Sequence, residues 1–269
     1  MMSITTSSTS RAAFLATLAV GAGITAFAQA GERPSDREVK QLIEEIDRGR
    51  DRFEDQLDPK VKASIIRNEK GELNVERYLD DLQDNLKNLK ERFNSDYAAS
   101  KEAEVVLRQS SEIHERVKSQ PKEMKGGSEW DTMAAGLTRL AAAYGTQFPV
   151  PRDAVVRRFN DKETADIAEE LAKNSEELKK QIDQEKSLAP PVRDAGKKAA
   201  DELTKQAKTV KSRVSDSRPA TAEMRSLLDL SRKMGDFMTS QRSLLPGTTG
   251  AWNAVQAPLG KLQQAYGIK

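Results

Sequence analysis

The amino-acid sequence predicts an all-α protein, built as two tandem duplicated four-helix bundles of antiparallel amphipathic helices after a signal peptide. Three observations lead to this fold class: apolar residues recur at helical spacing, a long stretch of sequence occurs twice, and an apolar segment opens the chain. Hydrophobic residues make up 37% and charged residues 32% of the 269 residues, so a core depends on that periodicity.

The first thirty residues have the pattern of a secretory signal peptide. Arg11 precedes an apolar run from Ala12 to Ala28, and Ala28-Gln29-Ala30 matches the small-residue cleavage pattern. We therefore expect residues 1–30 to be removed by cleavage after Ala30, which leaves a periplasmic or extracellular protein. A retained anchor is the alternative, although the run is short for a membrane span. No later stretch is apolar enough, so the mature protein is not expected to span a membrane.

The duplication is clearest near the end of each half. EWDTMAAGLTRLAAAYG begins at Glu129, and AWNAVQAPLGKLQQAYG begins at Ala251. An upstream segment, DREVKQLIEEI from Asp36, matches DKETADIAEEL from Asp161. Matches in several segments predict one module over residues 31–146 and a second over 152–269. Residues 147–151, QFPVP, contain two prolines and are expected to form a stiff, extended linker.

Within each module, apolar residues follow the spacing of a helical seam. A capping box, in which Ser35 and Glu38 bond each other's backbone, predicts the first helix start, and Asn160 with Glu163 forms a looser version. The predicted core positions of the first three helices are Val39, Leu42, Ile46, Phe53 and Leu57, then Val75, Leu79, Leu82, Leu86, Leu89 and Phe93, then Ala103, Val106, Ile113 and Val117. Their counterparts are Thr164, Ile167, Leu171, Leu178 and Ile182, then Ala200, Leu203, Ala207, Val210 and Val214, then Met224, Leu227, Met234 and Met238.

The repeated stretch is the predicted fourth helix of each module. Trp130 and Tyr144 in the first copy correspond to Trp252 and Tyr266 in the second, and all fall on one helical face. Two interpretations stay open: large aromatic residues usually anchor a core, or they form a binding platform for a ligand or peptide. These four residues are accordingly the candidate binding residues.

Two helix-weakening residues occupy the same place in this stretch. Gly136 in the first copy corresponds to Pro258 in the second, and either residue is poor in a helix interior. The coincidence predicts a kink or break there. The closing Tyr-Gly pair of each copy predicts a left-handed glycine cap at the helix end.

The sequence nominates no catalytic residue, metal ligand or cofactor. There is no Cys, and the only histidine, His114, has Ser111 three residues before it, which does not fit the Glu-x-x-His motif of di-metal bundles. His114 is expected on a helix surface. We found no nucleophile elbow, phosphate-binding loop or dinucleotide-binding motif. A pair of catalytic carboxylates brought together by the fold stays an open alternative.

A group of basic residues is the candidate surface for an anionic lipid or polysaccharide. Asp201 and Glu202 interrupt it and favour a solvated, ion-paired helix face instead. The basic residues are Lys197, Lys198, Lys205, Lys208, Lys211 and Arg213.

Net charge limits the class of partner. The whole chain is +2, which argues against nucleic-acid binding. Residues 31–150 contain 21 basic and 25 acidic residues, whereas residues 151–269 contain 22 and 17, so the halves could attract each other within or between chains. The leading hypothesis is a non-catalytic binding or scaffolding protein of the bacterial envelope, with an envelope protein or a second copy as partner. A carrier of small hydrophobic ligands, with a pocket in each bundle, is the alternative; a carboxylate enzyme is the third.

Overall fold

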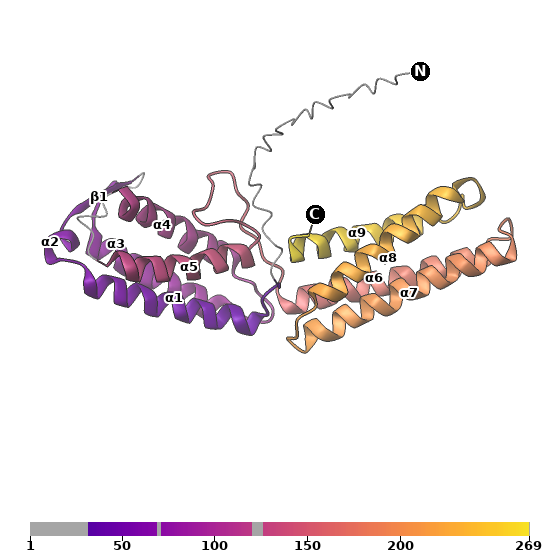
Figure 1. Cartoon of the computed structure of the whole chain (residues 1–269), viewed down its shortest axis with the longest axis horizontal. Helices are drawn as coiled ribbons and strands as arrows, with labels where there is room; N and C mark the ends of the chain where they lie inside the picture. Colours follow the sequence, from indigo (N-terminus) through magenta and orange to yellow (C-terminus); the bar gives the residue numbers. More distant parts are fainter. Residues whose placement is uncertain (1–31, 69–70, 120–125, 269) are drawn as a thin grey trace, which may run out of the picture.

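The computed structural model describes residues 32–68, 71–119 and 126–268. The predicted signal peptide and its cleavage site after Ala30 lie outside these residues. The all-α prediction is confirmed, with one small hairpin as an addition. The long helices gather into two groups, each around its own hydrophobic core, and the groups lie end to end (Figure 1).

The N-terminal helix group contains four long helices and a small insertion. Its long helices are α1 (Asp36–Gln56), α3 (Val75–Arg92), α4 (Ser100–Ser119) and α5 (Gly127–Ala143). Between α1 and α3 lie the short α2 (Pro59–Lys62) and an antiparallel hairpin of β1 (Ile65–Asn68) and β2 (Gly71–Asn74). Ile65 lies opposite Asn74 in the hairpin register.

The C-terminal helix group repeats the four long helices without the insertion. They are α6 (Asp161–Gln184), α7 (Pro190–Ser215), α8 (Thr221–Ser240) and α9 (Thr249–Tyr266). A turn over residues 185–189 joins α6 to α7, and the short 3-10 helix η1 (Arg242–Leu244) lies between α8 and α9.

The starts of α1 and α6 are set by local sequence. Glu38 N donates to Ser35 Oγ at 3.3 Å, and Ser35 N donates to Glu38 Oε2 at 2.7 Å. Asn160 and Glu163 make the same two bonds, at 2.7 and 2.9 Å. Both predicted capping boxes are therefore confirmed, and the one at Asn160 is complete. Each satisfies backbone N–H groups that a helix start leaves without an intrahelical acceptor.

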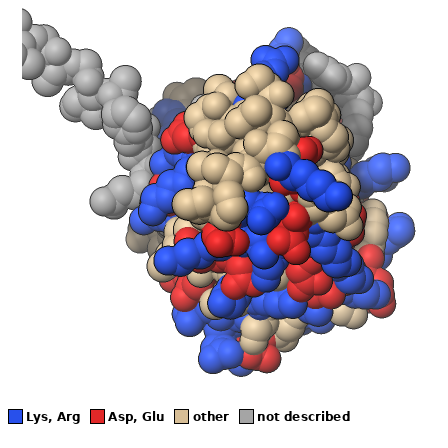
Figure 2. All heavy atoms as spheres, turned by 90° about the vertical axis from the view of Figure 1, so that its right-hand side faces the viewer, with Lys and Arg blue, Asp and Glu red and all other residues tan. Residues whose placement is uncertain are grey.

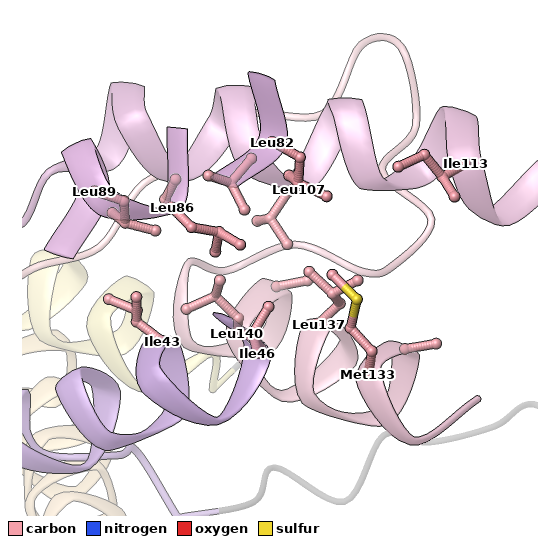
Figure 3. Packing of buried hydrophobic residues seen from close by; sticks show 14 of the residues in the cluster. Ile43, Ile46, Leu82, Leu86, Leu89, Leu107, Ile113, Met133, Leu137 and Leu140 are labelled. Carbon is pink, nitrogen blue, oxygen red and sulfur yellow. The ribbon is translucent and has the colours of Figure 1, made fainter. Parts of the chain in front are cut away.

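The seam positions predicted for the first three helices of each group are all buried. Figure 3 shows part of the N-terminal core, where side chains of α1, α3, α4 and α5 point toward one another. Leu82, Leu107 and Leu137 are among those that meet there, and none of the three is exposed. Burial of this apolar surface is the main stabilising contribution to each group.

The closing helices run without a break, so of the predicted kink or break the break is wrong. A Cβ on Gly136 would lie 3.0 Å from Ile46 Cγ1, so the glycine permits α5 to approach α1 closely. Pro258 lies inside α9 and has no N–H for the carbonyl of Ala254. Asn174 of α6 compensates, because its Nδ2 donates to that carbonyl at 2.8 Å. Neighbouring helices therefore account for both residues.

Both predicted glycine caps are confirmed, since Gly145 and Gly267 have φ of 69° and 61°. Between α5 and α6 the chain forms a connector, residues 144–160, which is longer than the predicted linker. The connector folds back on α4 instead of running straight to α6. Val150 N donates to Ser111 Oγ at 3.0 Å, and the guanidinium of Arg108 donates to two connector carbonyls.

Candidate functional site

The two helix groups meet where α1 and α6 begin, and two buried ion pairs join them. Arg33 Nη1 lies 2.7 Å from Asp161 Oδ1, and Arg158 Nη2 lies 2.9 Å from Asp36 Oδ1. The two arginine side chains are only 6% and 1% exposed. Arg33 and Arg158 are 125 residues apart, as are Asp36 and Asp161, so each pair is the counterpart of the other. We call these four residues the junction lock.

The backbone repeats this exchange. Asp36 N donates to Asp161 Oδ2, and Asp161 N donates to Asp36 Oδ2, both at 2.9 Å. Each carboxylate therefore accepts from the first turn of the opposite helix, where the helix dipole favours negative charge. Contacts that exchange partners in this way are the signature of a twofold relation between two surfaces.

Arg158 is the most deeply buried member of the lock. Its Nη2 also donates to the carbonyl of Pro34 at 2.6 Å. Burial and the nearby charge of Arg33 lower the pKa of Arg158, whereas Asp36 opposes the shift. Burial also raises the pKa of the neighbouring Tyr144 well above its usual value, so this phenol stays protonated. The buried charge of the Arg158 guanidinium would be costly without a partner, and Asp36 supplies that partner.

An open cleft of about 600 Å³ lies beside the lock, between the starts of α1 and α6 and the ends of α3 and α7. Arg37, Lys40, Lys162 and Lys211 line it. Lys162 pairs across the junction with Asp96, and Lys211 pairs with Glu169 at 2.7 Å. Two of these four basic side chains are therefore paired with neighbouring carboxylates.

The predicted aromatic residues of the N-terminal group are core residues. Trp130 and Tyr144 are fully buried. The Trp130 ring lies 5.0 Å from the ring of Phe53, and its Nε1–H donates to Nδ1 of His114 at 3.1 Å. Tyr144 donates its hydroxyl proton to the carbonyl of Ala98 at 2.7 Å. Every polar atom of these two side chains thus has a partner inside the group.

The surface location predicted for His114 is wrong. His114 is half-buried, it accepts the bond from Trp130, and the ring of Phe148 meets its edge at 5.3 Å. Phe148 belongs to the connector, whose path over α4 had no sequence signal. Burial lowers the pKa of His114, which favours the neutral imidazole that the bond from Trp130 requires.

The corresponding residues of the C-terminal group differ in one respect. Tyr266 is buried, burial raises its pKa to about 12, and the guanidinium of Arg33 lies 5.9 Å from its ring centroid. Trp252, however, is only half-buried. Gly235 lies 121 residues after His114, and within the described chain the indole N–H of Trp252 has no hydrogen-bond partner. Trp130 is thus buried in one group, whereas Trp252 is an accessible side chain in the other.

The predicted basic surface is largely ion-paired. Asp201 pairs with Lys205 at 2.7 Å, as the sequence spacing predicted. The other pairs are Lys197 with Asp183, Lys208 with Glu176, Lys211 with Glu169, and Arg213 with Glu223. Lys198 is the member without an ion pair among the described residues. Figure 2 looks onto the free end of the C-terminal helix group and shows basic and acidic side chains intermingled beside an uncharged area.

Across residues 32–68, 71–119 and 126–268 there is no group of three or more His, Cys, Asp or Glu side chains that could hold a metal ion. In the same part of the chain, no helix is both long and apolar enough to cross a membrane. Comparison with protein-family models, with curated proteins and with solved structures gave no match.

The junction lock was missed from the sequence, although a signal for it exists. The pattern Arg-x-x-Asp-x-Glu begins at Arg33 and again at Arg158, but the sequence match that indicates the repeat starts only at its aspartate. The pattern does not show that each arginine pairs with the aspartate of the other copy, because an Arg and an Asp three residues apart could equally pair with each other.

Proposed function

We propose that this chain is an exported, non-catalytic binding and scaffolding protein of the bacterial cell envelope, made of two duplicated four-helix bundles. The observation that carries the proposal is the junction lock. Two helix groups with separate cores are held end to end by buried, oriented charges, which suits a protein that keeps two surfaces in a set arrangement. Export rests on the signal-peptide pattern of residues 1–30.

Equivalent contacts in the two groups support the duplication. Arg92 lies 3.1 Å from Glu102, and their counterparts 121 residues later, Arg213 and Glu223, lie 3.2 Å apart. The capping boxes and the lock itself follow the same correspondence. Repeated ion pairs do not follow from the packing of apolar side chains, so we attribute them to a common origin.

The interior of the groups favours a scaffold over a ligand carrier. A carrier needs an apolar cavity, yet Trp130 and Tyr144 fill the N-terminal core and bond to its polar atoms. In the C-terminal group, Leu262 and Val255 of α9 are likewise fully buried. Two linked surfaces also gain avidity when both bind one assembly.

The proposal is tested by crosslinking the tagged mature chain, residues 31–269, in the envelope of its source bacterium and identifying the captured proteins. The expected result is a specific envelope protein, enriched over an unrelated tagged periplasmic protein. Recovery of only self-crosslinks, or of tightly bound lipid in an organic extract, would overturn the scaffold assignment.

A further inference from the structure

The connector shows what kind of segment fits one face of a helix group. Phe148 meets the edge of His114, and Val150 N donates to Ser111 Oγ. Arg108 donates to the carbonyls of Pro151 at 3.1 Å and of Ala154 at 3.0 Å. A bent segment with an aromatic residue and two prolines thus covers one face of α4 beside Trp130.

The same face of the C-terminal group is open in the described chain. By the 121-residue correspondence, Arg108 and Ser111 become Asp229 and Arg232. Asp229 and Arg232 pair with each other at 2.6 Å, and their side chains are 63% and 72% exposed. Arg108 is only 34% exposed and Ser111 only 8%, because the connector covers them.

Gly235 leaves space beside the tryptophan. A Cβ built on Gly235 would meet only Trp252 within 4 Å, at 3.5 Å from its Cζ2, apart from the backbone of its own helix. Trp252 is half-buried, and its N–H has no partner within the described chain. An aromatic surface next to a free N–H donor is the arrangement that recognises proline-containing extended segments, with the ring packing on proline and the donor bonding a carbonyl.

We propose that Asp229, Arg232, Gly235 and Trp252, which we call the Trp252 face, bind a segment of a second protein in which an aromatic residue is followed by proline. This deepens the scaffolding function and rests on it. Arg232 supplies the guanidinium for backbone carbonyls, the role that Arg108 has toward the connector. The chain's own connector is not the occupant, because Arg108 and Ser111 hold it on α4.

The probe for the experiment is a synthetic peptide, GTQFPVPRDAV, which copies residues 145–155 of this chain. It is titrated into the mature chain carrying Trp130→Phe, so that tryptophan emission reports Trp252 alone. We expect a saturable change in emission. A control peptide with alanine in place of its phenylalanine and prolines should produce none.

Two variants test the location by calorimetry with the same peptide. Trp252→Ala removes the ring, and Gly235→His refills the face as His114 does in the first group; each should weaken binding at least tenfold. Lys198→Ala on α7 is the matched control and should bind like the wild type. Circular dichroism establishes that each variant is folded. Because Gly235→His retains Trp252, loss of binding in both variants cannot be explained by the loss of tryptophan packing in the core.

No saturable binding up to about 1 mM peptide, the weak end of specific affinities, would overturn this inference. Equal affinity in all variants would do the same. A concentration-dependent dimer of the wild-type chain that the peptide dissociates would assign the segment to a second copy and also overturn the proposal as stated. Capture of a partner that Trp252→Ala does not weaken would leave the scaffolding function standing without this site.

Discussion

The junction lock makes a quantitative prediction for Asp36→Ala. The substitution removes the carboxylate that lies 2.9 Å from Arg158 Nη2 and that accepts from Asp161 N. Arg158 would keep the carbonyl of Pro34, but its nearest remaining carboxylate oxygen in the lock, on Asp161, is 4.0 Å away. A guanidinium that is 1% exposed would then be buried without a close counter-charge.

The expected cost follows from that burial. Removing one partner of a buried ion pair destabilises a protein by about 3–5 kcal/mol, because the other charge stays buried and unpaired. Asp36 itself is 16% exposed, so water can partly replace it, and we expect the low end, about 3 kcal/mol. Asp161→Ala should cost a similar amount, since Arg33 then loses its partner in the same way.

The assay is urea unfolding of the mature chain, followed by far-ultraviolet circular dichroism. Lys162→Ala is the matched control, because Lys162 pairs with Asp96 across the same junction at an exposed site. Exposed pairs contribute little, so this variant should keep the wild-type midpoint. An Asp36→Ala midpoint as high as that of Lys162→Ala would refute the role assigned to the lock.

Three further predictions concern the helix groups themselves. Trp130→Ala should lower the free energy of unfolding in urea by about 3–5 kcal/mol. Trp252→Ala should lower it by less than half as much, because Trp252 is half-buried. Equal losses would contradict the assigned burial. Burial lowers the pKa of His114, so as the pH drops the unfolded state binds a proton before the folded state does, and stability should fall as the pH drops through about 6.5. Unfolding midpoints measured from pH 8 to 5 should decline less for His114→Asn than for the wild type. Identical declines would exclude this contribution. A Cβ on Gly196 would lie 2.4 Å from Phe237 Cζ, so Gly196→Ala should lower the free energy of unfolding by about 1–3 kcal/mol. Adding Phe237→Leu should restore part of that loss. A Gly196→Ala variant as stable as the wild type would show that the Phe237 ring moves freely.

Features that depend on neighbouring residues along the chain were predictable. The helix starts at Ser35 and Asn160 follow from side chains that reach only three residues, and the burial of Leu82 and Leu203 follows from helical spacing. The left-handed cap at Gly145 is equally local. In each case the energy lies within one or two helical turns, so the pattern is visible in the sequence.

Features that depend on distant residues were not predictable in the same way. Gly136 and Pro258 predict a break when each helix is considered alone, but Ile46 and Asn174 on other helices make both positions compatible with a continuous helix. His114 looks like a surface residue until Phe148 folds over it.

The linear order of residues therefore settles which segments are helical and which face of each is apolar, because periodicity and capping act over a few residues. Tertiary packing decides the rest. It pairs Arg33 with Asp161 instead of with Asp36, and it leaves Trp252 accessible while it buries Trp130. The physical reason is that ion pairing and burial depend on distance in space, and two copies of one sequence pattern acquire different surroundings when only one of them lies under the connector.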